Sequence, residues 1–425
     1  MHIYNIFKLK CFLWQLAFYF LISILHFAYM IHYDDFNYVR FTQGIEFYFY
    51  LPRYILSSMI IVTYCVLLLY SKVSDFLYGI LLLILVFFVI PSGLLFSSNE
   101  ELNPGIFLMH NLFFLLVYTF SFVKWNMTFP RINNYQSMIL LISITTIGLI
   151  PFVILYGPYL NIRNLWMVEV YETRRLVEAN VHNLYTAYTY SWYTKIIIPT
   201  TLVFCIYFRK NALLIVSIIS LLFLYLCGAH KTVFYGTFFM IIFYKYDYLR
   251  KMTFFMKLMT LFLSLTIAAT LFFDFSILWE LSFRRALMLS ALLDYCYFDF
   301  FNHKYLYWSD SFLSSLVHYP YDISPDFIIG KEYFNKPEMN ANVGIISDGF
   351  KNAGYYGAII NIIVVAIILS FLNSLKISPK FFGLFILFLF TLLNSSLTTI
   401  LLTHGGGLMV LVAMFLLRNT QTTLK

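Results

Sequence analysis

Residues 76–96 read FLYGILLLILVFFVIPSGLLF and decide the fold class, because this run of 21 residues contains no charged side chain. A bilayer core of about 30 Å needs about 20 apolar helical residues to cross it. The whole chain has the same character, with 61% apolar residues, 11% charged residues and a mean hydropathy of +0.80. This composition is too apolar for a soluble domain and predicts an all-α polytopic membrane protein.

Similar apolar windows recur and predict about twelve transmembrane helices in a single integral membrane domain, residues 1–425. The first window follows Lys8 and Lys10 as a signal peptide would. Its length and its lack of a small-residue cleavage site predict that it is retained as a span. The windows lie near 12–31, 53–71, 76–96, 107–123, 137–157, 192–208, 211–228, 232–246, 256–273, 355–373, 381–398 and 400–417.

The basic residues predict the orientation, because loops rich in Lys and Arg are retained in the cytoplasm. If both termini are cytoplasmic, the inner segments hold 15 of the 28 basic residues but only two of the 20 acids, Asp75 and Asp247. We therefore predict a multi-pass membrane protein with both termini cytoplasmic. The formal charge of +8 is then a signal of membrane orientation, and nucleic acid is not expected as a partner.

Two larger outer loops, about 158–191 and 274–354, stand out from this pattern. The second includes most of the stretch from Phe283 to Gly357, roughly 75 residues rich in aromatic and carboxylate side chains. A connection between spans needs only a few residues, so a loop of this length is expected to carry function. Its first part, Leu281 to Phe301, is apolar enough to form a helix on or in the membrane surface.

Two pairs of arginines lie near the predicted outer ends of spans, Arg174 with Arg175 and Arg284 with Arg285. An enzyme that acts on a membrane-borne diphosphate has to neutralise a leaving group, and the planar guanidinium grips phosphate oxygens in pairs. Lys231, in a tight outer turn, is a further candidate. Local pairing of Arg174 and Arg175 with nearby glutamates, and anchoring of a surface helix by Arg284 and Arg285, are the alternative interpretations.

A carboxylate can accept the proton of an attacking sugar hydroxyl. Seven acids of the large loop are candidates for this base, and most are expected to be solvated loop residues. Asp299 is the preferred base, because its aromatic neighbours predict an apolar surround that would raise its pKa. His303 and His318 are competing bases. The acids are Asp294, Asp299, Asp310, Asp322, Asp326, Glu332 and Asp348.

The sequence lacks a P-loop, a dinucleotide-binding glycine motif placed between strand and helix, and an H-E-x-x-H motif. Its five cysteines have no metal-ligand spacing, so no metal and no cofactor are expected. No domain is present to hold a nucleotide sugar on the cytoplasmic side. The spans also lack the series of charges that marks an ion pathway.

Several short motifs lie in and between the two outer loops. The upstream motifs are Tyr171-Glu-Thr-Arg174, Ile198-Pro199 and Gly228-Ala-His-Lys231-Thr232. The motifs of the large loop are Arg285 to Phe301 with Tyr297-Phe-Asp299-Phe-Phe301, Trp308-Ser-Asp-Ser311, Ile328-Ile-Gly330, Tyr333-Phe334, Asn342-Val-Gly-Ile-Ile-Ser-Asp-Gly-Phe350 and Gly354-Tyr-Tyr-Gly357. Together these motifs resemble the Wzy-type polymerases of O-antigen and capsular repeat units. The resemblance covers the span count, the loop layout and roughly residues 168–360.

This resemblance implies a glycosyltransferase of the bacterial inner membrane that polymerises undecaprenyl-diphosphate-linked oligosaccharide repeat units at the periplasmic face. Arg174, Lys231 and Arg285 match the basic positions of the family, and Asp299 and Asn342 match its polar positions. Membrane lipid, a chain-length regulator and a flippase are the implied partners. We expect the three matching cations to converge on one lipid diphosphate.

Three other functions fit parts of the pattern. An O-antigen ligase uses the same donor but joins the glycan to lipid A core. A glycosyltransferase that uses a lipid monophosphate sugar needs an acid in the first outer loop, where Asp34 and Asp35 lie. A lipid-oligosaccharide flippase or other transporter is expected to show repeat symmetry and charges within its spans, and the sequence shows neither.

Overall fold

The computed structural model describes residues 2–32, 47–127, 129–130, 132–166, 169–181, 183–230, 232–273 and 278–418. About 76% of the chain is helical, and the described ranges contain no β-strand. Seven described helices are long and apolar enough to cross a membrane, which confirms the all-helical, multi-pass membrane character. They are Tyr4–Phe27, Leu51–Tyr70, Asp75–Phe96, Asn134–Tyr159, Asn211–Gly228, Tyr248–Thr270 and Ile345–Ser374.

Each of the other predicted windows overlaps a shorter or interrupted helix, so the figure of about twelve spans is not confirmed. Pro104–Phe120, Pro379–Leu392 and Gly406–Phe415 are apolar but contain at most 17 residues. The window 381–398 ends early because helix α17 stops at Leu392, before the polar run from Asn394 to Ser396. The window 400–417 is divided at Gly405, which has a φ of +80°. Hydropathy alone does not register these backbone breaks.

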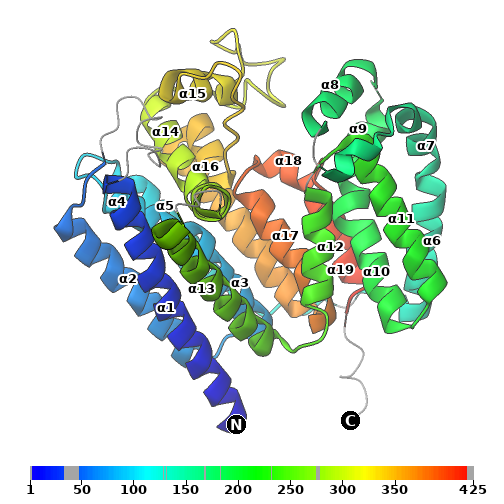
Figure 1. The fold of residues 1–425 in the computed structure, drawn as a ribbon, viewed down its shortest axis with the longest axis horizontal. Helices are drawn as coiled ribbons and strands as arrows, with labels where there is room; N and C mark the ends of the chain where they lie inside the picture. The colour runs from blue at the N-terminus through cyan, green and yellow to red at the C-terminus, as the bar shows by residue number, and fades with distance from the viewer. Residues whose placement is uncertain are drawn as a thin grey trace. The chain divides into compact units, whose positions relative to one another are not determined.

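The chain forms two compact units (Figure 1). Unit 1 consists of Met1–Val123, Tyr248–Ser370 and Leu392–Leu397, and unit 2 of Lys124–Asp247, Phe371–Thr391 and Thr398–Lys425. Both units contain membrane-length helices. The prediction of one integral membrane domain therefore stays a prediction.

Unit 1 is built around a fully buried, continuous helical segment, Asp75–Phe96. This segment comprises α3 (Asp75–Ile84), the π-helical turn η3 (Leu85–Val89) and α4 (Ile90–Phe96). The other elements of unit 1 are α1 (His2–His32), α2 (Leu51–Tyr70), α5 (Pro104–Phe120), α13 (Tyr248–Phe273), η7 (Trp279–Met288), α14 (Leu289–Phe300), α15 (Pro325–Phe334) and most of α16 (Ile345–Ser374).

Several chain segments meet at one end of unit 1, which we call the loop end. The backbone N–H groups of Tyr48 and Tyr50, before α2, donate to the carbonyls of Ser98 and Ser97, after α4. His26, near the end of α1, bonds the hydroxyl of Ser98 at 2.6 Å. The loop end therefore contains the end of α1, the start of α2 and the residues that follow α4.

α1 and α13 run parallel, and this places the large loop at the loop end. Thr253 and Thr260 of α13 donate at 3.4 Å to the carbonyls of Phe7 and Trp14 of α1. Both partners advance by seven residues, so the two helices point in the same direction. The C-terminal ends of α1 and α13 therefore lie on the same side of unit 1, as the predicted topology requires.

α16 contains two antiparallel arms joined by a sharp turn, although it was predicted as a simple span from residue 355. Ala353 and Gly354 depart from helical geometry, and Gly354 has a φ of +61° and a ψ of −148°. The carbonyl of Ile345 accepts a bond from Asn361 at 2.8 Å, and the two backbones approach closely at Gly349 and Gly357. The first arm, residues 345–352, therefore folds back on the second, which supplies the predicted span.

The hydroxyl of Tyr355, which begins the second arm, bonds Asn103 at 3.2 Å, so the turn lies at the loop end. Asn361 is six residues further along a helix, and Ile345 therefore lies roughly 9 Å deeper. Non-helical backbone at that depth is tolerated where protein buries it. The chain before Ile345 fits this rule, because Ala341, Val343 and Gly344 are buried.

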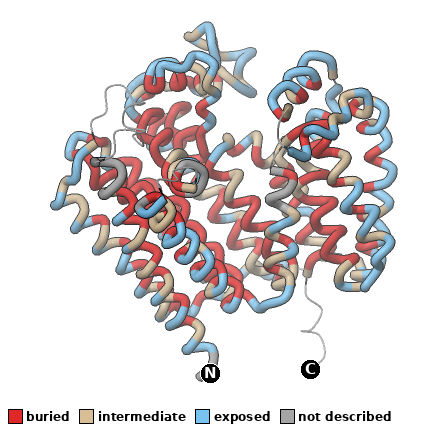
Figure 2. Tube along the Cα trace, in the orientation of Figure 1, coloured by how far each residue is buried: buried red, intermediate tan, exposed pale blue. Residues whose placement is uncertain are grey.

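Unit 2 packs its helices around α10 (Ile198–Tyr207), which is buried along most of its length (Figure 2). α6, α11 and α12 contact α10. The elements of unit 2 are α6 (Asn134–Gly148), α7 (Ile150–Tyr156), η4 (Gly157–Tyr159), η5 (Ile162–Trp166), α8 (Val170–Asn180), α9 (Leu184–Trp192), η6 (Tyr193–Ile197), α10, α11 (Asn211–Gly228), α12 (Thr232–Ile242), η8 (Pro379–Phe381), α17 (Phe382–Leu392), α18 (Leu397–Leu401) and α19 (Gly406–Phe415).

Candidate functional site

The arginine pair of the large loop lies on a helix that crosses the loop end. η7 and α14 form one continuous helix from Trp279 to Phe300. Phe283 lies 6.5 Å from His26 of α1, and Phe298 lies 6.0 Å from Tyr355 of α16, measured between ring centroids. Residues 291–298 of this helix are buried in unit 1, and its placement at the membrane surface stays a prediction.

Arg285 and Asp299 are both exposed but lie near opposite ends of this helix. Arg284 is half-buried. Fourteen helical residues rise about 20 Å, far more than the few ångströms between a diphosphate and the hydroxyl that displaces it. The two residues predicted to serve one bond are therefore held apart, and this separation argues against Asp299 as the base beside an Arg285-bound diphosphate.

The carboxylate of Asp299 takes part in a polar cluster with α15. The hydroxyl of Tyr333 donates to Oδ2 of Asp299 at 2.5 Å. Burial, and then this bond, raise the pKa of Tyr333 well above its usual range, so its hydroxyl stays a donor. Asp299 itself is exposed, and the apolar surround expected for its carboxylate is not found, because the preceding buried residues face into unit 1.

Asn342 lies at the same end of α14 as Asp299. Tyr297, two residues before Asp299, donates its hydroxyl to the carbonyl of Ala341 at 3.1 Å. Asn342 follows Ala341 and is exposed. The structure thus pairs the predicted residue Asp299 with Tyr333, which sequence reasoning did not assign as a site residue, and it places Asn342 near the same end of α14. Carboxylate, amide and phenol groups are suited to binding sugar hydroxyls.

The first arm of α16 holds a buried charge cluster. Nζ of Lys351 lies 2.5 Å from Oδ2 of Asp310 and 3.5 Å from Oδ1 of Asp348. Asn352 bonds the backbone N–H of Trp308 through its side-chain oxygen at 2.8 Å. Lys351 pairs with the loop acid Asp310, and its neighbour Asn352 bonds the loop backbone at Trp308. This cluster therefore fixes residues 306–310 against α16.

A second buried network joins three helices of unit 1. Nε2 of His110 lies 3.1 Å from Oδ2 of Asp294, and Ser347 donates to Oδ1 of Asp294 at 2.5 Å. A nucleophilic triad requires histidine between serine and carboxylate. Here the carboxylate is in the middle, so the network holds α5, α14 and the first arm of α16 together without activating Ser347.

In unit 2 the structure places Arg174 on the turn that precedes Lys231. Nε and Nη2 of Arg174 donate to the carbonyl of Ala229 at 3.0 and 2.8 Å. Its guanidinium also lies 5.6 Å from the ring centroid of Tyr171. The guanidinium of Arg174 thus bonds a neutral carbonyl and not a nearby glutamate, the partner considered from the sequence. These bonds do not neutralise its positive charge. Arg175 is exposed on α8.

His230 lies beside this turn and is uncharged near neutral pH. Burial lowers its pKa to about 4, and the positive charges of Arg174 and Lys195 contribute in the same direction. Its ring centroid lies 5.2 Å from that of Tyr190. The positive charge near this turn therefore comes from Arg174 and Lys195 and not from His230.

Some predicted positions lie outside the described residues, namely Lys231 and the acids Asp34 and Asp35. The convergence of Arg174, Lys231 and Arg285 on one ligand stays a prediction. Among the described residues no group of three or more His, Cys, Asp and Glu side chains has the arrangement of a metal site.

Sequence reasoning missed His110, Ser347, Lys351 and Asn352 as parts of the buried networks. The spacing of Asp348 and Lys351, three residues apart, was the available signal for the charge cluster. His110 gave no signal, because a single histidine on an apolar helix does not reveal a partner far away in the chain.

A scan against protein-family models and searches of curated proteins and of solved structures found no match to this chain. The functional conclusion therefore depends on the residues and their geometry.

Proposed function

We propose that this chain is a membrane glycosyltransferase that polymerises undecaprenyl-diphosphate-linked oligosaccharide units at the outer face of the bacterial inner membrane. The growing glycan leaves its lipid diphosphate as a sugar hydroxyl of the next unit attacks the anomeric carbon. The bond to the diphosphate oxygen breaks, and the hydroxyl proton passes to a base. The energy is already stored in the donor, so no nucleotide is needed at the site.

The observation that carries this proposal is the helix across the loop end. It presents Arg285, exposed, toward one end and the bonded pair of Asp299 and Tyr333 near the other, where Asn342 also lies. A lipid-linked glycan has the same polarity, because its anionic diphosphate and its sugars are separated along one molecule. A helix that exposes a cation at one position and a hydroxyl-binding group about 20 Å away suits such a substrate.

Within this proposal Arg285 stabilises the leaving diphosphate, and Arg284 supports it. Asp299 and Asn342 bind sugar hydroxyls at a distance from the reacting bond. Arg174, Arg175 and Lys231 are proposed to bind the lipid-linked substrate through their positive charge. The base is left without an assigned residue, since Asp299 lies too far along the helix from Arg285.

The test is an assay of the purified chain in lipid vesicles with a synthetic undecaprenyl-diphosphate repeat unit as the only sugar substrate. A ladder of products that differ by one repeat unit, with release of the lipid diphosphate, supports the polymerase. Transfer only to added lipid A core identifies a ligase. Movement of the substrate across the bilayer without new glycosidic bonds identifies a flippase and contradicts the proposal.

A further inference from the structure

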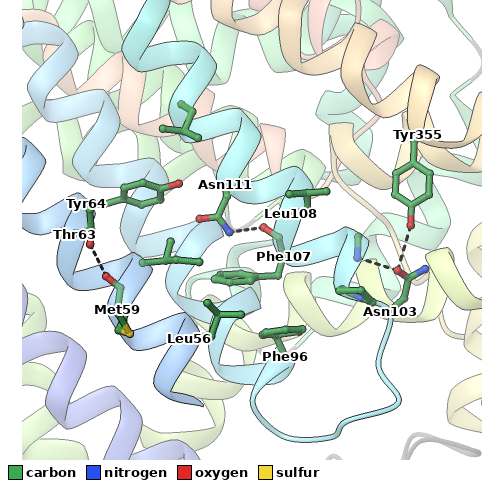
Figure 3. Close-up of a pocket in the computed structure, with 14 residues that line it drawn as sticks. Leu56, Met59, Thr63, Tyr64, Phe96, Asn103, Phe107, Leu108, Asn111 and Tyr355 are labelled. Atoms are coloured by element: carbon green, nitrogen blue, oxygen red, sulfur yellow. Dashed lines mark hydrogen bonds between the residues drawn. The ribbon is translucent and has the colours of Figure 1, made fainter. Parts of the chain in front are cut away.

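A pocket of about 750 Å³ opens between α2 and α5 in unit 1 (Figure 3). Its walls are mostly apolar, and several of its lining side chains are exposed to the surroundings of the protein. Leu56 of α2 is 50% exposed, Met59 of α2 is 64% exposed and Leu108 of α5 is 61% exposed. α2 is one of the membrane-length helices, so this pocket opens toward the hydrocarbon of the bilayer.

One end of the pocket is polar and lies at the loop end. Asn103 caps α5 by accepting from the N–H of Gly105 at 2.8 Å, and it also accepts from Tyr355. Both side chains line the pocket (Figure 3). The lining continues along α5 to Leu115, twelve residues further, which corresponds to about 18 Å of helix. The pocket is therefore an elongated groove with a polar mouth and an apolar body.

A cation, Arg53, lies next to this mouth, although it is not one of the lining residues. The guanidinium of Arg53 is 4.3 Å from the ring centroid of Phe96, which lines the groove. Nη1 of Arg53 donates at 2.8 Å to the carbonyls of Asn99 and Leu102, just before Asn103. Both bonds use Nη1, so other N–H groups of the guanidinium can serve a ligand.

We propose that this groove binds an anionic membrane phospholipid, with a hydrocarbon chain along α2 and α5 and the phosphate at the mouth beside Arg53. Three features select this ligand over a neutral lipid or another helix. The walls are apolar, the mouth combines Arg53 with the amide of Asn103, and the shape is narrow and long. Glu100 and Glu101 of the same loop are exposed and weaken the positive field without removing the direct contact. The site does not depend on the proposed reaction.

The test uses tryptophan quenching by brominated lipids in bilayers of phosphatidylcholine. The full chain carries Leu108→Trp as the reporter in the groove, and Ile215→Trp on the exposed face of α11 is the control. Fluorescence of the unsubstituted protein is subtracted. We expect brominated phosphatidylglycerol to quench the L108W reporter at about one fifth of the mole fraction that brominated phosphatidylcholine requires, the preference expected for one basic contact. The I215W reporter should show no preference.

Adding Arg53→Gln should abolish the preference at L108W, whereas Arg53→Lys should keep most of it, which separates loss of charge from loss of folding. Equal quenching of L108W by the two lipids would overturn the proposal. Failure of both lipids to quench L108W while both quench I215W would mean that protein covers the groove, and this result also contradicts a lipid site.

Discussion

Two buried or half-buried cations, Lys351 and Arg174, differ in the groups that bind them. In unit 1, Lys351 is buried between two carboxylates, Asp310 and Asp348. In unit 2, Arg174 is half-buried, and its Nε and Nη2 donate to the neutral carbonyl of Ala229. A cation compensated by carboxylates holds structure, and its removal leaves buried negative charge. A cation bound by a backbone dipole keeps its charge for an anionic ligand. The difference predicts that Lys351 supports folding and Arg174 supports function.

The largest effect is expected from Lys351→Met. This substitution leaves Asp310 and Asp348 without their cation, and breaking such a buried pair costs about 3–5 kcal/mol. Thermal unfolding in detergent micelles should show a large loss of stability, while Lys331→Ala, an exposed lysine on α15, should change little. Unchanged unfolding of K351M would remove the distinction between the two cations.

Arg174→Gln should reduce polymerisation by about 10²–10³, the effect of losing one preorganised charge donor, with much less loss of stability than K351M. Arg174→Lys should recover only part, because a point charge cannot reproduce the planar guanidinium. Arg163→Gln is the matched control, since Arg163 forms an exposed pair with Glu169 at 2.6 Å that contributes little. Rates are measured with the synthetic lipid-linked unit at matched protein amounts. Normal polymerisation by a folded R174Q protein would show that its charge is not used.

A substitution at the turn of α16 should have a smaller effect on the free energy of unfolding, and this effect should be confined to unit 1. At Gly354, φ is +61°, and an added Cβ would meet the hydroxyl of Tyr305 at 2.8 Å. Gly354→Ala should therefore destabilise the protein by about 1–3 kcal/mol. Gly157→Ala is the control, because an added Cβ there meets no atom within 4 Å. Equal unfolding temperatures for G354A and the wild type would argue against the two-armed form of α16.

The pH dependence of unit 2 should be the smallest effect. The pKa of His230 is lowered to about 4, below its unfolded value of about 6.5, so the unfolded chain binds more protons between these values. The contribution of neutral His230 to the free energy of unfolding is fully present above about pH 6.5 and is lost as the pH falls toward 4. The loss should be about 1–2 kcal/mol after allowance for partial exposure. His230→Gln should flatten this part of the profile, whereas His303→Gln, at an exposed loop residue, should not. An identical profile for H230Q would contradict the assignment.

The positions of the apolar helices could be predicted from the sequence, because burial in lipid requires long runs of apolar residues. The predicted span 355–373 starts where the second arm of α16 starts. The first arm could not be predicted from hydropathy, since the charged residues Asp348 and Lys351 are typical of a loop and not of a buried helix. The spacing of Gly349, Gly354 and Gly357 was the usable signal, because two backbones meet there.

The candidate site was predictable only in part. Arg285 and Asp299 are exposed, as residues that contact a substrate must be. Their separation follows from a helix that continues without a break from η7 into α14, and a sequence read as a loop does not reveal this continuity. The bond between Asp299 and Tyr333 joins residues 34 positions apart and requires the fold.

The most direct test of the central claim is the polymerisation rate of Arg285→Ala in the purified system, with Lys304→Ala, an exposed cation of the same loop, as the control. If Arg285 stabilises the leaving diphosphate, R285A should lose about 10²–10³ in rate while K304A stays near the wild type, and Arg285→Lys should recover only part of the loss. A folded R285A protein that makes polymer of normal length at the normal rate would contradict the account.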